Sequence, residues 1–208
     1  MARYTGSVCK LCRREQTKLF LKGEKCFVKC VLERHPNPPG RIPKRRSKLS
    51  EYALRLREKQ KLRHMAGMLE GSFRRFVSQA ERLPGATGET LLRLLEMRLD
   101  NVVRRSGFAT SPKMARQLVL HGHILVNGKA LNIPSCLLRP GDFLELKQAI
   151  RENVGVKLSL EAVQRRNARP AWMEFQSDGM KAKVLRWPSR EEMSFPIREQ
   201  LIVEHYSK

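Results

Sequence analysis

The sequence is poor in acidic residues and has no long apolar segment. Its 208 residues include 20 Asp and Glu against 42 Lys and Arg, which gives a formal net charge of +22. Self-repulsion on this scale destabilises a compact monomer and is most easily tolerated when a polyanion neutralises it. No apolar run is long enough to span a membrane, and neither a lipidation motif nor a signal-peptide core is present. We therefore expect a cytoplasmic protein with a nucleic-acid partner and no membrane partner.

Motifs of catalytic sites are also missing. The sequence has no phosphate-binding Gly-rich loop, and no G-x-S-x-G, H-E-x-x-H or kinase-type set occurs. None of the scattered histidines has a serine or cysteine at the spacing that a nucleophile–base pair would need. We therefore expect that the protein is not an enzyme and has no small-molecule substrate. With 41% apolar residues the chain can bury a core, and its length suggests one or two modest domains.

Two close pairs of cysteines stand near the start of the chain. Cys9 and Cys12 form a C-x2-C pair, and Cys26 and Cys30 form a C-x3-C pair after a short loop. Two such pairs can converge as four thiolates in a tetrahedral site, where one structural metal would fold a segment with little core of its own. Zinc is the default, and an iron–sulfur cluster on the same four cysteines is the alternative. A pair of disulfides is a further reading, which a reducing cytosol disfavours.

The stretch from residue 97 to 147 predicts two short helices, a hairpin and a strand. The first helix pattern stops at Gly107, and Ser111 followed by Pro112 gives the second helix the order preferred at helix starts. Asn127-Gly128 lies between apolar residues and is typical of a hairpin turn. The alternation over 143–146 predicts a strand. The region therefore reads as a helix–helix–hairpin unit with one cationic helical edge.

A long basic helix is predicted from Ser50, which would act as its cap. A buried stripe is expected on this helix at Leu54, Leu62, Met65 and Leu69. The cations at 55, 57, 59, 61 and 63 outnumber the local Glu51 and Glu58, and exposed cations so dense repel one another unless they line phosphates. In the last third of the chain, Trp172 and Trp187 are expected to anchor the core.

Three parts of the 97–147 stretch resemble the S4 RNA-binding domain: Arg98-Leu99-Asp100-Asn101-Val102-Val103, Ala115-Arg116-Gln117-Leu118-Val119 and His123-Ile124-Leu125-Val126-Asn127-Gly128. Several RNA-modifying enzymes and a tRNA synthetase also carry such a domain. Flanking segments extend the resemblance nearly end to end, and they look like the zinc- or cysteine-containing form of the bacterial small-subunit ribosomal protein S4 (uS4) family: Ala2-Arg3-Tyr4, Arg13-Arg14-Glu15, Leu56-Arg57-Glu58-Lys59-Gln60-Lys61 and Leu201-Ile202-Val203-Glu204-His205-Tyr206-Ser207-Lys208.

The resemblance and the patterns together predict an α+β fold. We expect a helical N-terminal domain with a four-cysteine metal-binding segment, and an S4-type RNA-binding domain of two short helices and a small, mostly antiparallel sheet. The expected boundaries are 1–42 for the metal-binding segment, 43–96 for the helical rRNA-binding domain, and 97–196 for the S4 domain with an α/β extension. Residues 197–208 are expected to pack back on the helical domain.

The family resemblance also implies a function. It suggests a structural constituent of the small ribosomal subunit that binds a helix junction in the 5′ domain of 16S rRNA directly and nucleates 30S assembly. Because RNA duplexes hide their base edges in a deep major groove, recognition should rest on shape, phosphates and 2′-hydroxyls. Neighbouring ribosomal proteins are further implied partners. The residues expected to contact rRNA are mostly basic: Arg3, Arg13, Arg14, Lys22, Tyr52, Arg55, Arg57, Lys59, Lys61, Arg63, Arg74, Arg98, Asn101, Arg104, Arg105, Lys113, Arg116, Gln117 and His121.

A proline-rich basic segment follows the cysteines, and two readings of it stay open. The family resemblance suggests that Arg45, Arg46 and Lys48 touch incoming mRNA near the entrance of the small subunit, or neighbouring rRNA, and contribute to translational accuracy, whereas the plain reading is a stiff, solvated tether. A zinc-dependent DNA-binding regulator is a second functional class. It is disfavoured because the positive charge extends over most of the chain instead of one recognition helix.

Overall fold

A computed structural model describes residues 3–41, 48–166, 169–176, 180–193 and 195–207 of the protein. The chain divides into two compact units. Unit 1 consists of Met1–Leu92 and Phe195–Lys208, and unit 2 consists of Arg93–Ser194. The cysteine-containing segment lies in unit 1, and helix α6 (Thr87–Glu96) carries the chain from unit 1 into unit 2.

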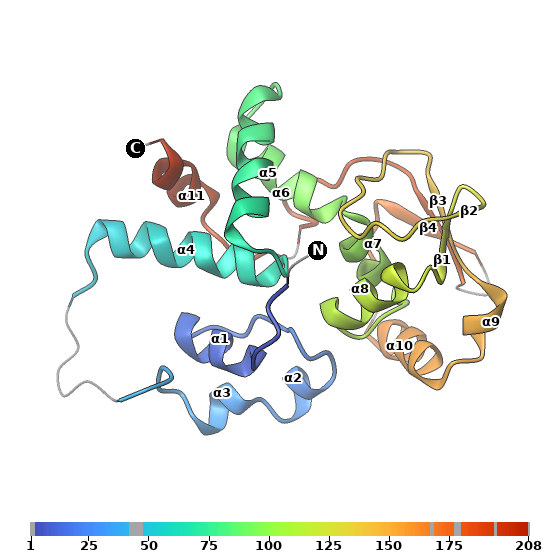
Figure 1. The fold of residues 1–208 in the computed structure, drawn as a ribbon, viewed down its shortest axis with the longest axis horizontal. Helices are drawn as coiled ribbons and strands as arrows, with labels where there is room; N and C mark the ends of the chain where they lie inside the picture. Colours follow the sequence, from blue (N-terminus) through green and yellow to red (C-terminus); the bar gives the residue numbers. More distant parts are fainter. Residues whose placement is uncertain (1–2, 42–47, 167–168, 177–179, 194, 208) are drawn as a thin grey trace. The chain divides into compact units, whose positions relative to one another are not determined.

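Unit 1 is built from helices in the part that the structure describes. Besides the start of α6, they are α1 (Val8–Glu15), α2 (Lys25–Val28), α3 (Val31–Arg34), α4 (Glu51–Met65), α5 (Glu70–Arg82) and α11 (Glu199–Tyr206). Helix α1 packs against α3 and α4, and α11, at the end of the chain, packs against α4 (Figure 1). Leu62, Phe73 and Val77 are buried in the core of this unit, so α4 and α5 present their apolar sides to it.

Helix α4 begins where the sequence predicts, because the Ser50 hydroxyl accepts a hydrogen bond from the Ala53 backbone N–H at 3.2 Å. The predicted buried stripe is only half right: Leu62 and Met65 are buried, but Leu54 and Leu69 are exposed. Burial in α4 starts at Lys59, past Leu54. Leu69 is not on this helix at all, since the chain turns at Gly67, which has a φ of +63°, and α5 then starts directly after Leu69.

Unit 2 combines helices with one antiparallel sheet. After α6 it contains α7 (Leu99–Arg105), α8 (Pro112–Leu120), β1 (Ile124–Val126), β2 (Lys129–Ala130), β3 (Phe143–Leu146), α9 (Gln148–Arg151), α10 (Val154–Arg165), β4 (Met173–Phe175) and β5 (Lys181–Val184). The strand order is β2-β1-β3-β5-β4, and each neighbouring pair is antiparallel. The predicted α+β class, with a helical N-terminal part and a small antiparallel sheet, is confirmed.

Local sequence signals place the helices and the hairpin of unit 2. The Ser111 hydroxyl accepts from the Met114 N–H at 3.3 Å, and Pro112 occupies the first position of α8. Asn127 and Gly128 both have positive φ, at 50° and 78°, as a two-residue hairpin turn requires. The Asn127 side chain also accepts a hydrogen bond from the Phe143 N–H at 2.9 Å, which ties the turn to β3.

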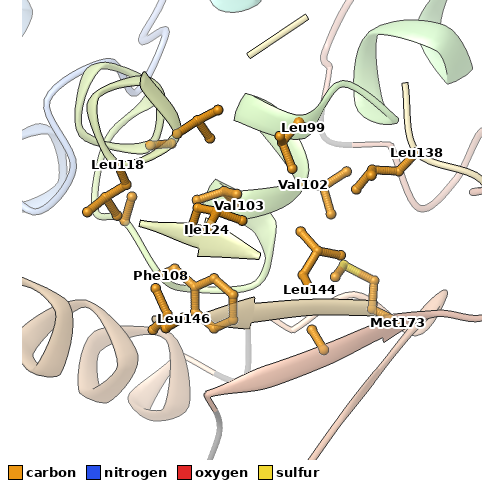
Figure 2. Packing of buried hydrophobic residues seen from close by; sticks show 14 of the residues in the cluster. Leu99, Val102, Val103, Phe108, Leu118, Ile124, Leu138, Leu144, Leu146 and Met173 are labelled. Carbon is orange, nitrogen blue, oxygen red and sulfur yellow. The ribbon is translucent and has the colours of Figure 1, made fainter. Parts of the chain in front are cut away.

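The core of unit 2 lies between the helices and the sheet. Figure 2 shows Leu99, Val102 and Val103 of α7 above side chains of β1 and β3, among them Ile124 and Leu144, and all five are fully buried. Burying one such side chain contributes about 1.5–3 kcal/mol. The apolar side of α7 is thus held on the sheet, which leaves its polar residues for other contacts.

Of the two expected tryptophan anchors, one is confirmed and one is wrong. Trp172 is buried in the core, while the side chain of Trp187 is 40% exposed because β5 ends at Val184 and the chain has left the sheet at that point. In the part of the chain that the structure describes, no helix has both the length and the apolar character needed to cross a membrane.

Candidate nucleic-acid interface

Two acidic residues organise the polar side of α7 and α8. Asp100 accepts two hydrogen bonds from the buried Arg98, at 3.0 and 2.7 Å, and a third from Arg116 of α8 at 3.2 Å. Because both arginines share one carboxylate, Asp100 links the start of α7 to α8 and neutralises part of their charge. The guanidinium of Arg98 is almost completely buried, so its main role in the free protein is structural.

The buried Glu96 at the end of α6 forms a second acidic centre. Its carboxylate accepts from the Arg105 guanidinium at 2.5 and 3.0 Å and from the Asn101 amide at 2.7 Å. Sequence reasoning selected Arg105 and Asn101 as rRNA contacts but missed both Glu96 and Asp100. Only the Arg98–Asp100 pair had a local signal, since these residues are two apart, whereas Arg105 lies nine residues from Glu96 and Arg116 sixteen from Asp100.

Arg104 differs from its neighbours because its side chain makes no hydrogen bond or ion pair among the described residues. Burial, and then the charge of Arg105, lower the pKa of its guanidinium to about 10. The group is still protonated at neutral pH, so a half-buried positive charge stays uncompensated by a direct partner. An external anion such as a phosphate would relieve this cost, which makes Arg104 a strong candidate contact.

The outer side of α8 carries a second set of available groups. Lys113, Gln117 and His121 are all exposed, and their spacing of four residues places them along one side of the helix. The ring of His121 lies near that of His123, with centroids 5.9 Å apart. Together with Arg104, this stripe is the part of unit 2 that is best placed to meet a phosphate backbone without first breaking an internal ion pair.

The sequence predicted that the cations of α4 are exposed and lack enough acidic partners, and this prediction is wrong. Arg55 pairs with Glu204 at 2.7 Å, Arg57 with Glu15 at 3.2 Å, Lys59 with Glu70 at 2.8 Å, Lys61 with Glu58 at 2.5 Å and Arg63 with Glu70 at 3.6 Å. Glu15 and Glu204 come from α1 and α11, which lie far from α4 in the sequence, while Glu70 begins α5, the next helix along the chain. Local counting of charges could not find them.

Glu70 is the centre of the α4 network. Burial would raise the pKa of its carboxyl, but hydrogen bonds from Lys59 and from the Tyr206 hydroxyl hold that pKa below its ordinary value. Burial, and then the same contact, raise the pKa of Tyr206 well above its usual range. Glu70 thus connects α4, α5 and α11 through charged and neutral donors, and this triple connection stabilises unit 1.

The other expected contacts of unit 1 fall into two groups. Arg13 is bound internally, since it donates to the Asn37 carbonyl at 2.8 Å and to the Pro38 carbonyl at 3.3 Å, and thereby holds the proline-rich segment on α1. Tyr52 is 64% exposed, with its ring 5.7 Å from that of His205. The remaining candidates are exposed cations: Arg3, Arg14, Lys22 and Arg74.

The basic segment expected near mRNA is only partly visible. Lys48 is exposed and precedes α4, whereas Arg45 and Arg46 lie outside the described residues.

The four clustered cysteines belong to three helical segments. Cys9 and Cys12 lie on α1, Cys26 lies on α2, and Cys30 precedes α3, and none of them forms a disulfide. Burial raises the pKa of Cys12, a backbone N–H from Leu19 lowers it, and the other three sulfurs raise it further. In the described ranges, however, no group of three or more His, Cys, Asp or Glu side chains has the arrangement of a metal site.

Comparison with known proteins covers the chain from end to end. Residues 3–96 match the family model for the ribosomal protein S4/S9 N-terminal domain, and residues 97–144 match the model for the S4 domain. Small ribosomal subunit protein uS4 of Thermodesulfovibrio yellowstonii is 52% identical, that of Anaeromyxobacter sp. (strain K) 53%, and that of Pelotomaculum thermopropionicum 51%. Each similarity extends over 209 aligned residues and covers 100% of both chains. The chain therefore belongs to the uS4 family of small ribosomal subunit proteins.

Proposed function

We propose that this chain is a structural, non-catalytic component of the small ribosomal subunit in the cytoplasm, and that it binds 16S rRNA directly. The observation that carries the proposal is the full-length similarity to proteins named small ribosomal subunit protein uS4. The net charge of +22 and the available cations of α7 and α8 agree with a polyanionic partner.

The proposed binding mode follows from which cations are already engaged. Arg98, Arg105 and Arg116 are held by buried carboxylates, so they keep α7 and α8 in place and shape the surface. Arg104 and the exposed stripe of α8 would then contact phosphates and 2′-hydroxyls of folded RNA. Each unit would contact part of a helix junction in the 5′ domain, and fixing these helices would favour early steps of 30S assembly alongside neighbouring ribosomal proteins.

A finer part of the proposal concerns the basic segment before α4. Arg45, Arg46 and Lys48 would lie near incoming mRNA and contribute to translational accuracy. The exposure of Lys48 and the basic composition support this role. Replacing all three by glutamine should lower ribosomal affinity for mRNA downstream of the decoding site and leave 5′-domain binding unchanged. An unchanged mRNA footprint would favour the tether instead.

We also propose that Cys9, Cys12, Cys26 and Cys30 hold one structural metal, a zinc ion or, as the alternative, an iron–sulfur cluster. Support comes from the spacing of the two cysteine pairs in the sequence, from the packing of α1 against α3, and from a backbone N–H of Lys22 that donates to the Cys26 sulfur at 3.3 Å. The metal would supply a cross-link between α1, α2 and the start of α3, a region where α2 and α3 bury none of their own residues.

Metal analysis of the full chain, purified under reducing conditions, tests this part. One zinc per chain without visible absorption would identify zinc, whereas iron, sulfide and visible absorption would identify a cluster. Cys9→Ser should lower the metal content in either case. A wild-type chain that retains neither metal would refute the site.

Competition binding tests the main proposal. The full chain is bound to the 5′ domain of 16S rRNA at one moderate salt concentration, against a scrambled structured RNA of equal length and duplex DNA. A large preference for the rRNA domain is expected. Equal binding to all three would show that the positive charge supports only nonspecific binding to nucleic acids.

A pair of charge-reversal variants then tests the α8 stripe. Lys113→Glu should weaken rRNA binding and reduce the slope of log affinity against log salt by about one. Lys157→Glu changes the same charge on an exposed lysine of the same unit that already pairs with Glu152, so it serves as the matched control. Equal effects of the two variants would remove α8 from the interface.

A further inference from the structure

Two phenylalanine rings meet on the surface of the cysteine segment. The centroids of Phe20 and Phe27 are 4.9 Å apart with the ring planes 32° from parallel, and the side chains are 36% and 49% exposed. Aromatic residues make up only 6% of this chain, and large exposed apolar groups that lie together mark sites of interaction more often than single ones do. We refer to Phe20 and Phe27 as the aromatic pair.

The backbone around Phe20 is built to keep that ring outside. The residues on either side of it, Leu19 and Leu21, are both buried, and Phe20 itself has a φ of +50°, an unfavourable conformation for a bulky side chain. Such a conformation persists only where the surrounding structure enforces it. Here, the loop before Phe20 is held on α1, where the Thr17 N–H donates to the Cys12 carbonyl at 3.2 Å.

The second ring is positioned by the same site. Phe27 directly follows Cys26, whose sulfur accepts the Lys22 N–H at 3.3 Å. The loop that carries Phe20 and the short helix that carries Phe27 are therefore each attached to a cysteine of the cluster. The position of the aromatic pair therefore follows from backbone contacts within the cysteine segment.

The charges around the pair indicate what kind of partner it would meet. Lys22, Lys25 and Lys29 are exposed within the same loop and helix, against one exposed acid, Glu24. Lysine is depleted in the centres of protein–protein interfaces, whereas lysines beside exposed aromatic rings are typical of surfaces that bind single-stranded nucleic acid. In such a complex, the two rings would face the flat surface of a base, and the lysine ammonium groups would face the phosphates.

We propose that Phe20 and Phe27 form a stacking platform for an unpaired nucleobase of the RNA that this chain binds, with Lys22, Lys25 and Lys29 contacting the flanking phosphates. This inference rests on the proposed function and deepens it, because it adds a contact to a base to an interface otherwise made of phosphate contacts. Stacking tolerates any base, so the platform selects an unpaired nucleotide by its position in the folded RNA.

The test uses the full chain, the 16S rRNA 5′ domain and a salt series. Phe27→Leu keeps an apolar side chain of similar size and removes the aromatic face, and it should lower affinity roughly 5- to 100-fold, the range for one lost base–aromatic stack. The slope of log affinity against log salt should not change, because stacking releases no counterions. Lys25→Gln should instead lower that slope by about one.

Val28→Ala is the matched control. Val28 is 72% exposed and adjacent to Phe27, so its truncation removes apolar area without touching an aromatic face. It should change affinity less than twofold, and Phe27→Tyr should bind like the wild type. Circular dichroism and metal content, measured for every variant, should match the wild type.

Three results would overturn the platform. Wild-type affinity of Phe27→Leu would show that no base stacks there, and equal losses in Phe27→Leu and Val28→Ala would show plain apolar packing. Unchanged rRNA affinity with reduced incorporation of a neighbouring protein into reconstituted particles would assign the pair to a protein partner. In all three cases wild-type preference for the rRNA domain persists, whereas failure of the proposed function would abolish that preference itself.

Discussion

Replacing Asp100 by asparagine tests the buried ion network of unit 2. The carboxylate accepts three hydrogen bonds from Arg98 and Arg116, and the side chains of Asp100 and Arg98 are only 11% and 4% exposed. Asparagine keeps the size but removes the carboxylate charge that Arg98 and Arg116 share. Breaking a buried pair in this way costs about 3–5 kcal/mol, so Asp100→Asn should destabilise unit 2 by about 3 kcal/mol, since the amide oxygen still accepts one bond.

The chain offers a specific probe for this measurement. Both of its tryptophans, Trp172 and Trp187, lie in unit 2, so tryptophan fluorescence during urea unfolding reports this unit and not unit 1. The control is Glu161→Gln, which breaks an exposed (i, i+4) pair with Arg165 in the same unit and should cost less than about 0.5 kcal/mol. If Asp100→Asn shifts the free energy of unfolding by no more than the control, the pair is screened by solvent and the structural role given to Arg98 is wrong.

Three further predictions concern the other networks. Cys9→Ser should release the proposed metal and loosen the N-terminal segment while tryptophan fluorescence still reports a folded unit 2; loss of that signal would contradict independent units. Tyr206→Phe removes the hydroxyl donated to Glu70 at 2.8 Å and should destabilise unit 1 by about 1 kcal/mol in thermal unfolding followed by circular dichroism; an unchanged melting curve would show that water replaces it. Hydrogen bonds from Arg186 and from the Ser189 N–H lower the pKa of Glu192 to about 2, against an ordinary value of 4.5. Because the folded-state pKa is depressed, the stabilisation is present above pH 4.5 and is lost as the pH falls toward 2. Carboxyl NMR titration should place the midpoint near 2 and, in Arg186→Gln, nearer to the ordinary value; equal midpoints in the two proteins would refute the contact.

The sequence by itself determined the features that depend on local backbone chemistry. Ser50 and Ser111 cap their helices as predicted, because a hydroxyl accepts the N–H three residues later whatever lies elsewhere in the chain. Asn127-Gly128 forms the expected turn, since few other residues accept two successive positive φ angles. The apolar side of α7 could also be predicted, because it repeats with the period of the helix. These signals, and the family motifs among them, were sufficient for the α+β class.

Only the tertiary structure decided which charged groups are already engaged. Glu15 and Glu204 reach α4 from opposite ends of the chain, so the α4 cations read as unbalanced in sequence and are paired in the fold. The exposure of Leu54 and Trp187 could not be predicted from the sequence either, since burial depends on what packs over a side chain and not on its type alone. Ion pairing and burial depend on contacts between segments that are distant in the sequence, and local composition does not predict those contacts.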